Sequence, residues 1–478
     1  MVTTWRALTC ISTIQNRSFM RQLKKCMVCL AAVLLPMGCW SQSLQEAISM
    51  ALERYPSIAS SRYKTEAAKS DITRAQGAHW PQLSWSGSYN DYRNDGLPNR
   101  WIQTPVLSLN LWSGGRIQSD VERSQAQARA SQNQESITRD DVALFTSEAY
   151  LQWAHHMKMT VLARENLNAH EKILNDFQII TRVDPGRRID LNQAQVRFDN
   201  AKLSMIRSEI DMRLAAERLA RMIMAPAPPE PSGLEFSPTI PYPTLARAQA
   251  DLNDEHPVIA RLLAQREAAL ASVRYARAQG APTVNLSHAK SIPPGLAQGL
   301  FVTQLQLNVP LIDGGTAQGA VGVAMANLRS LEADLLETRL TLNEQLASSW
   351  ANWQLSGQRA DMGKEQTRTA QTLAYGYEQQ FRAGRRSLLD LLNIQSDLYT
   401  YKSNTATALN ESLLSQVRIL AHLGQLANAY KIAAAAALPT ARPATIDIHH
   451  LHTNTLSPLR VQVLSQSETD STSPSNLE

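Results

Sequence analysis

Four short segments of the chain alternate apolar residues with uncharged polar ones. In the first, Leu83 and Trp85 alternate with serines, and in the last, Leu305 and Leu307 alternate with Gln and Asn. The other two segments lie around 107–111 and 284–287. A period of two predicts strands with one apolar and one polar face, each about ten residues long. The pattern fits equally a sheet with lipid outside and water inside, and a soluble sheet that packs on helices.

Two very long helices are predicted after each pair of strands. Residues 116–182 contain neither Gly nor Pro, and residues 311–438 contain no Pro. A continuous helix over the first of these stretches would be about 100 Å long. A globular domain cannot surround such a rod, so we expect the helices to pack side by side in a bundle, coiled coil or cylinder. The fold class is therefore mainly α with a small β part.

The chain is an internal duplication with an offset of about 200 residues, far above the period of solenoid repeats. Arg74-Ala-Gln-Gly-Ala78 recurs identically at 277–281, and Leu107-Ser-Leu-Asn110 recurs as Leu305-Gln-Leu-Asn308. We predict a first repeat over 44–224 and a second over 244–426, each with the order strand, strand, long helix, long helix. The Pro-rich stretch 225–243 is typical of a stiff linker. Residues 430–478 are rich in Ala, Thr, Ser and Pro, which predicts a disordered tail.

The N-terminus has the pattern of an export signal over residues 1–42. Met20 to Lys25 is basic, and Cys26 to Trp40 is apolar but too short to span a bilayer as a helix. Cleavage is expected near Ser41 to Leu44, and Met20 is a plausible alternative start. Acylation of Cys39 remains open. All four cysteines precede residue 40, so the rest of the chain has no disulfide, thiol chemistry or Cys-bound zinc.

Charge gives no support to nucleic-acid binding. The chain has 47 Lys and Arg against 42 Asp and Glu, but its excess of base lies in the N-terminus. No acidic residue occurs in 1–42, which contains Arg6, Arg17, Arg21, Lys24 and Lys25. The remainder is therefore balanced. No spacing is typical of a nucleophile and base, the glycines at 314–322 lack the lysine of a phosphate loop, and His449, His450 and His452 could chelate a metal but lie in the predicted tail, so neither an enzyme nor a cofactor is expected.

If the sheet lies in a membrane, one chain cannot complete it. The smallest membrane barrels have about eight strands, and open strand edges are not tolerated in lipid. Several copies must then share one barrel, and a trimer would supply twelve strands.

Together these features resemble the TolC family of bacterial outer-membrane channels over about residues 44–426. The motifs that carry the resemblance are Ala51-Leu52-x-x-Tyr55-Pro56-x-Ile58, the repeated Leu-x-Leu-Asn strand followed by Gly-Gly, and the segment from Phe381 to Leu392. The resemblance implies a homotrimer with a shared 12-stranded transmembrane β-barrel in outer-membrane lipid and a periplasmic α-barrel. It also implies a periplasmic adaptor protein and an inner-membrane ABC or RND transporter as partners, with no chemistry catalysed.

The resemblance also implies roles for residues at the two helix turns, 182–190 and 382–390. Asp190, Arg386 and Phe381 match or occupy positions of a periplasmic gate. Asp390 and Asn393 occupy the two positions of an acidic pore ring. The turn residues Gly186, Arg187, Arg188, Gly384 and Arg385 would face the adaptor. Phe381 lacks the hydroxyl of the gate tyrosine, so one hydrogen bond of about 1 kcal/mol should be absent. An Asp at 190 or 390 also simply complements the helix dipole.

The function that this resemblance implies is an exit channel for type I protein secretion or for multidrug efflux. The first turn, Arg182-Val-Asp-Pro-Gly-Arg-Arg-Ile-Asp190, resembles secretion-type members slightly more. The alternative from another class is a periplasmic coiled-coil scaffold or adhesin stalk without a pore.

Overall fold

The computed structural model describes residues 43–90, 100–229, 240–291 and 299–429. The predicted export signal, including Cys39, lies outside these residues, as do the predicted tail and the middle of the predicted linker.

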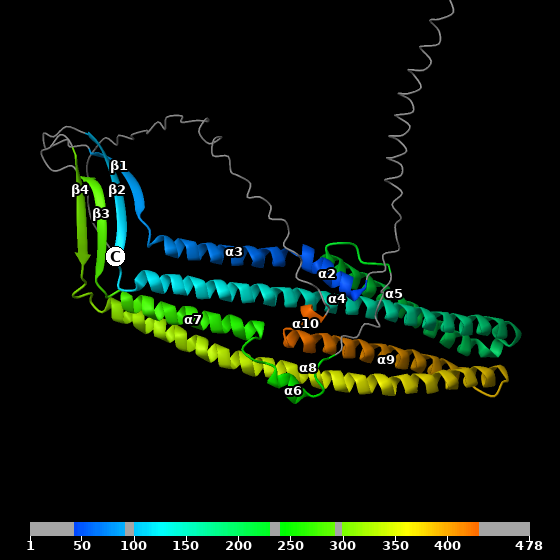
Figure 1. The fold of residues 1–478 in the computed structure, drawn as a ribbon. Helices are drawn as coiled ribbons and strands as arrows, with labels where there is room; N and C mark the ends of the chain where they lie inside the picture. Colours follow the sequence, from blue (N-terminus) through cyan, green and yellow to red (C-terminus); the bar gives the residue numbers. More distant parts are fainter. Residues whose placement is uncertain (1–42, 91–99, 230–239, 292–298, 430–478) are drawn as a thin grey trace, which may run out of the picture. The chain divides into compact units, whose positions relative to one another are not determined.

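The described chain contains the duplicated unit, which confirms the predicted fold class (Figure 1). The elements of the first half are α2 Leu44–Arg54, α3 Pro56–Gly77, β1 Gln82–Asn90, β2 Arg100–Trp112, α4 Arg116–Val183, the 3₁₀ turn η1 Pro185–Arg187 and α5 Arg188–Ile223. Those of the second half are α6 Leu245–Ala250, α7 Pro257–Ala278, β3 Thr283–Ser291, β4 Leu300–Asn308, α8 Thr316–Arg382, α9 Leu388–His422 and α10 Leu426–Ala429.

Short polar and glycine signals set where the helices begin. Ser43 and Glu46 form a reciprocal capping box that starts α2. Tyr55 is extended because it precedes Pro56, so the helical pattern breaks there into α2 and α3. Gly115 and Gly315 both have φ +85°, and they turn the chain from strand into long helix in each half.

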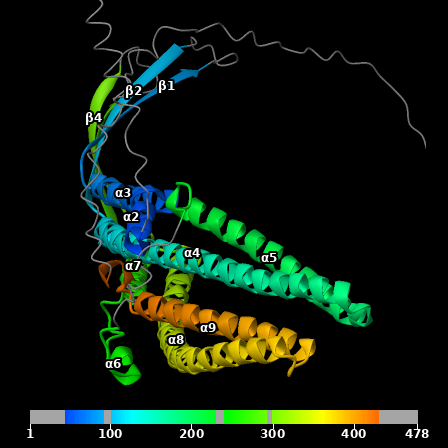
Figure 2. The same ribbon diagram turned by 90° about the vertical axis from the view of Figure 1, so that its right-hand side faces the viewer.

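The long helices α4 and α8 are 68 and 67 residues long, and each runs past several shorter helices. Helix α4 packs against α3 and α7 toward the sheet, and against α5 and α9 toward the turns (Figures 1 and 2). Helix α8 packs against α7 and then α9. The order of neighbours is therefore α3 or α5, then α4, then α7 or α9, then α8. The layer of helices therefore has two different edges. One edge is formed by α3 and α5, and the other is formed by α8.

The largest core cluster joins the two halves midway along α4. Tyr150 and Trp153 of α4 are fully buried there, with their rings 5.5 Å apart. Helix α2 contributes Ile48, α5 contributes Leu219, and α9 contributes Leu420. The first described helix is therefore held at this level rather than near the sheet.

The four strands form one antiparallel sheet in the order β1-β2-β3-β4. The register of each pair puts the apolar members of the alternation on a single continuous face. The apolar residues of that face are Leu83, Trp85, Tyr89, Trp101, Pro105, Leu107, Leu109, Val284, Leu286, Phe301, Leu305 and Leu307, and it also carries Gln103, His288, Lys290 and Thr303. The other face is mostly Ser, Thr, Asn and Gln, and Asn110 donates a 2.7 Å hydrogen bond to Asn285 across it.

No described helix packs on either face of the sheet. Trp85 is 71% exposed and Leu305 is 65% exposed. A soluble sheet would need helices to cover its apolar face, so the structure contradicts that interpretation. β1 and β4 are also left as unpaired edges within the described chain.

Asp140 of α4 is a partly buried carboxylate beside the core cluster, and replacing it should raise stability. Burial raises its pKa to about 6, although the backbone N–H of Ala427 donates to its Oδ1 at 3.4 Å. The pKa of the Asp140 carboxyl is therefore higher in the folded protein than in the unfolded chain. Its contribution to stability is fully present below about pH 4 and is lost as the pH rises through about 6. We expect Asp140→Asn to stabilise the protein by about 1–3 kcal/mol at pH 7.5, and by nothing below pH 4.

Thermal unfolding of the detergent-solubilised protein between pH 4 and pH 8 measures this difference. Asp140→Ala is the control, because it removes the charge and also the acceptor for Ala427. A gain from Asp140→Asn that did not change with pH would contradict burial of the charge as the cause.

Candidate functional site at the helix turns

The first turn is built around Asp184 and Asp190. The Asp184 side chain accepts a hydrogen bond from the Gly186 N–H at 3.1 Å, which caps the 3₁₀ turn. Arg187 Nε donates to Asp190 Oδ2 at 3.1 Å. The Arg187 guanidinium also lies 5.4 Å from the centre of the Phe177 ring. Asp190 is thus paired within its own turn.

The second turn has a matching cap formed by Ser387 and Asp390. Ser387 Oγ accepts from the Asp390 N–H at 3.2 Å and donates to Asp390 Oδ2 at 2.9 Å. Arg386 Nη1 lies 3.6 Å from the same Asp390 oxygen, and its Nε donates to Gln380 at 3.1 Å. The Arg386 guanidinium lies 4.3 Å from the centre of the Tyr377 ring. The Ser387 hydroxyl, aided by Arg386, holds the pKa of Asp390 below its usual value, so this carboxylate is ionised at neutral pH.

The two turns are joined by a small core, which we call the tip core. Phe177 is fully buried there, with its ring 5.6 Å from that of Phe381. Leu388 and Leu392 of α9 are buried in the same cluster. At the rim, Lys172 Nζ donates to Glu378 at 2.9 Å. The turns are therefore held as one unit by packing between the two halves.

The structure brings the predicted gate and ring residues together only in part. Arg386 contacts Asp390, but Asp190 contacts Arg187 rather than Arg386 within this chain. Asn393 receives a weak 3.4 Å hydrogen bond from Arg197. Phe381 lies half-buried in the tip core.

The residues that were predicted to face an adaptor fall into two groups. The side chains of Arg188 and Arg385 are exposed and form no hydrogen bond or ion pair within the described chain, whereas Arg187 contacts Asp190 and Phe177. Gly186 donates to the Asp184 cap, and Gly384 takes φ +71° to end the turn that follows α8. These two glycines therefore shape the turns.

Sequence reasoning missed three side chains that organise this site. Ser387, three residues before Asp390, has capping-box spacing that could have been recognised. Phe177 and Tyr377 lie within long helices, and no local pattern marks them as supports for Arg187 and Arg386.

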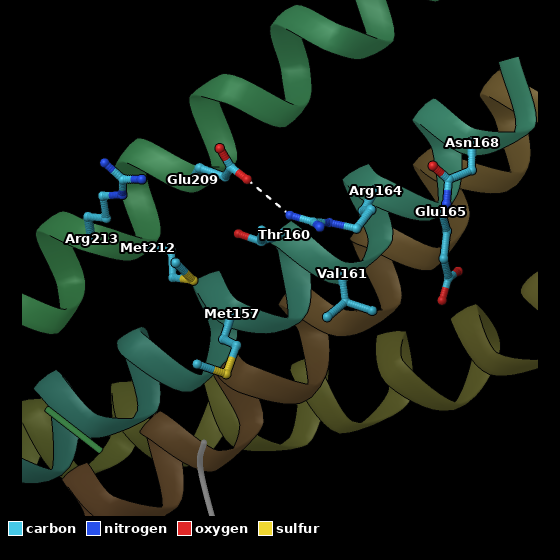
Figure 3. Close-up of a pocket in the computed structure, with 9 residues that line it drawn as sticks. All are labelled: Met157, Thr160, Val161, Arg164, Glu165, Asn168, Glu209, Met212 and Arg213. Atoms are coloured by element: carbon cyan, nitrogen blue, oxygen red, sulfur yellow. Dashed lines mark hydrogen bonds and ion pairs between the residues drawn. The ribbon is translucent and has the colours of Figure 1, made fainter. Parts of the chain in front are cut away.

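A cavity of about 400 Å³ between α4 and α5 is a second candidate site (Figure 3). Met157 and Met212 line it together with charged residues of both signs. Arg164 of α4 reaches across it to Glu209 of α5 at 3.1 Å. Its lining has two arginines and two glutamates, and Arg164 and Glu209 already bind each other. The cavity is therefore a weaker candidate than the turns for binding a partner.

Within the described residues, no group of His, Cys, Asp and Glu side chains has the geometry to hold a metal ion.

The described helices include none that combines the length and apolarity needed to cross a membrane.

Comparison with known proteins decides the family. The profile of the family described as "Outer membrane efflux protein" matches residues 47–223 and 250–425. The chain belongs to the outer membrane efflux protein family. The two matched segments correspond to the two halves of the duplicated fold. They also contain both helix turns.

Curated relatives and solved structures agree with this family. The alkaline protease secretion protein AprF of Pseudomonas aeruginosa is 25% identical over 73% of this chain and 75% of its own. The outer membrane protein TolC of Vibrio cholerae is 19% identical over 85% of this chain and 96% of its own. The open state of the Neisseria gonorrhoeae MtrE outer membrane channel has a TM-score of 0.68 at 19% identity, covering 80% of this chain and 88% of its own.

These findings confirm the resemblance to the TolC family. The protein is an outer-membrane channel of the efflux and secretion type. Its family members are channel proteins rather than enzymes.

Proposed function

We propose that three copies of this chain close one channel, which exports a protein substrate in type I secretion. The observation that carries the proposal is the sheet, whose apolar face is exposed and whose edges β1 and β4 are unpaired within the described chain. Pairing β4 of one copy with β1 of the next removes both edges, as lipid requires. Three copies then supply twelve strands, enough to enclose a pore lined by the polar face.

The helical edges support the same head-to-tail arrangement. Val196, Leu203 and Ile210 of α5 recur every seven residues and are all more than half exposed. On the other edge, α8 exposes Leu355 and Met362, again seven apart. A seven-residue apolar repeat is the pattern of a helix that packs on another helix. Since the two edges differ, their contact is heterologous, and it generates a ring if the rotation closes.

The channel would act as a passive exit duct. A periplasmic adaptor would bind the helix turns, and an inner-membrane transporter would supply the energy, so this chain would catalyse no reaction. A scaffold or stalk without a pore predicts no conductance. Purified protein should therefore be cross-linked to a trimer and should form channels in planar bilayers. A monomer, or a trimer that never conducts, would refute the duct.

Secretion is favoured over drug efflux by the first turn and by the similarity to the alkaline protease secretion protein AprF. Deletion of the gene decides between them. We expect a protein to disappear from the culture medium while drug tolerance is unchanged. Increased drug sensitivity with an unchanged set of secreted proteins would assign the channel to efflux.

We also expect the mature N-terminus to be free of lipid, between Ser41 and Leu44. Helix α2 is buried in the central core, and the 22-residue helix α3, about 33 Å long, separates it from the sheet. Four residues from Cys39 to Ser43 reach at most about 14 Å. An acyl chain on Cys39 would therefore fall short of the bilayer that holds the sheet. Intact-mass measurement of envelope protein tests this, and an acylated Cys39 would contradict it.

A further inference from the structure

The helix turns carry more arginine than their own acidic residues can neutralise. Residues 182–190 and 382–390 together contain six arginines and three aspartates. Every one of the three carboxylates is already engaged. Asp184 caps the 3₁₀ turn, Asp190 binds Arg187, and Asp390 binds Ser387 and Arg386.

Three of the six guanidinium groups are satisfied within the chain. Arg187 and Arg386 bind the aspartates and lie over aromatic rings, and Arg382 donates to Glu378 at 2.8 Å. The other three, Arg182, Arg188 and Arg385, are exposed, and their side chains form no hydrogen bond or ion pair within the described chain. A guanidinium has five donors, so these three groups can bind carboxylates without breaking any bond of the tip.

Apolar side chains alternate with the unpaired arginines. Val183 follows Arg182 and is 86% exposed, and Ile189 follows Arg188 and is 74% exposed. Leu389 of the second turn is half exposed as well. These side chains present a mixed cationic and apolar surface, which we call the tip surface and define as Arg182, Val183, Arg188, Ile189, Arg385 and Leu389.

We propose that the tip surface binds a protein loop in which acidic and apolar residues alternate. The adaptor of this channel would then be the protein that carries such a loop. The proposal rests on the proposed function, which places an adaptor at the turns. The loop's carboxylates would bind Arg182, Arg188 and Arg385, and its apolar residues would cover Val183 and Ile189.

An acidic protein fits this surface better than an anionic membrane does. Proteins that lie on membranes typically present Trp or Tyr at the interface. Here Phe177, Phe381 and Tyr377 belong to the tip core, where they support one another and the paired arginines. What remains for a partner is guanidinium and aliphatic surface. Such a surface suits bidentate binding of carboxylates flanked by Leu or Val.

The test uses the full-length channel in detergent and fluorescent helical-hairpin peptides with a defined loop. One peptide has the loop Glu-Leu-Glu-Leu, and the others have Gln-Leu-Gln-Leu or Lys-Leu-Lys-Leu. We expect the Glu peptide to bind about tenfold more tightly than the Gln peptide, with an affinity that falls as salt rises. The Arg182→Glu/Arg188→Glu/Arg385→Glu variant should lose the Glu peptide and bind the Lys peptide instead.

The matched control changes Arg62, Arg218 and Arg329 to Glu, since these are also exposed and unpaired within the described chain but lie away from the turns. The control should bind the Glu peptide as the unchanged protein does. Equal binding of the Glu and Lys peptides, or an unchanged affinity in the tip variant, would overturn the proposal. Weaker binding of the tip variant than of the control to phosphatidylglycerol vesicles, with no difference between them in affinity for the Glu peptide, would overturn it in favour of a lipid surface. The unchanged protein and the control variant should conduct in bilayers, so a failure of peptide binding is distinct from a failure of the channel function.

Discussion

Leu305→Arg should abolish assembly of the channel in the outer membrane. Leu305 lies on the apolar face of β4, opposite Leu286 of β3, which in turn pairs with Leu109 of β2. It is 65% exposed, and no described helix shields it. An arginine on the lipid face of a barrel costs about 2–4 kcal/mol near the bilayer midplane. A trimer incurs this cost three times, a total of about 6–12 kcal/mol, which is as large as the whole free energy of unfolding of a typical fold, about 5–15 kcal/mol.

Gln306→Arg is the matched control, because Gln306 is the next residue and lies on the polar face. There the arginine would face water, so assembly should be close to normal. The amount of heat-modifiable trimer in isolated outer membranes measures both variants. If Gln306→Arg removed the trimer and Leu305→Arg did not, the two faces would be assigned the wrong way round. Equal amounts of trimer would mean that this sheet does not meet lipid.

The fold was predictable because its signals are long and are repeated. A helical stretch without Gly or Pro, such as 116–182, leaves little choice of structure, and the observed α4 covers Arg116–Val183. The period of two in the strands likewise fixed which residues share a face. What periodicity could not decide was whether helices cover the sheet. That depends on contacts between segments far apart in sequence, and only the structure shows that none covers it.

The site was predictable only at its turns. Pro185, Gly186 and Gly384 mark the ends of the helices, because they supply a fixed φ or a left-handed backbone. Which charge pairs with which could not be derived in the same way. Asp190 binds Arg187 of its own turn. Arg386, in the turn after α8, instead contacts Tyr377 and Gln380 near the end of that helix. These partners lie within nine residues of one another, but several charged groups compete at each turn, and the path of the backbone through the turn decides which of them meet.

The link between Arg386 and Asp390 changes how the pore ring must be tested. Asp390→Ala would remove the ring charge, but it would also release Arg386 and the Ser387 cap. Asp390→Asn keeps an acceptor for Ser387 while it removes the charge. We therefore propose that cation selectivity should be read from Asp390→Asn, since a change in resting conductance from Asp390→Ala mixes two causes.

Asp190→Ala and Arg386→Ala should each raise the resting conductance of the reconstituted channel. The resemblance to the TolC family implies that both hold neighbouring helices closed at the tip. An exposed pair contributes about 0.2–1 kcal/mol, so losing one in each of three chains should shift the ratio of closed to open channels by about threefold to 100-fold. Asp390→Asn should lower cation selectivity instead, with little change in resting conductance, because its ionised carboxylate attracts cations.

Arg187→Ala separates a contact within one chain from a contact between chains. Arg187 is the partner of Asp190 within the turn. If Asp190 closes the tip by binding a neighbouring chain, Arg187→Ala should have less than half of the effect of Asp190→Ala, because Arg187 only orients the carboxylate. If the pair within the turn maintains closure, the two variants should leak equally. Asp176→Ala is the control, since Asp176 is exposed on α4 and unpaired within the described chain. Unchanged currents in Asp190→Ala, Arg386→Ala and Asp390→Asn would place the constriction away from the turns.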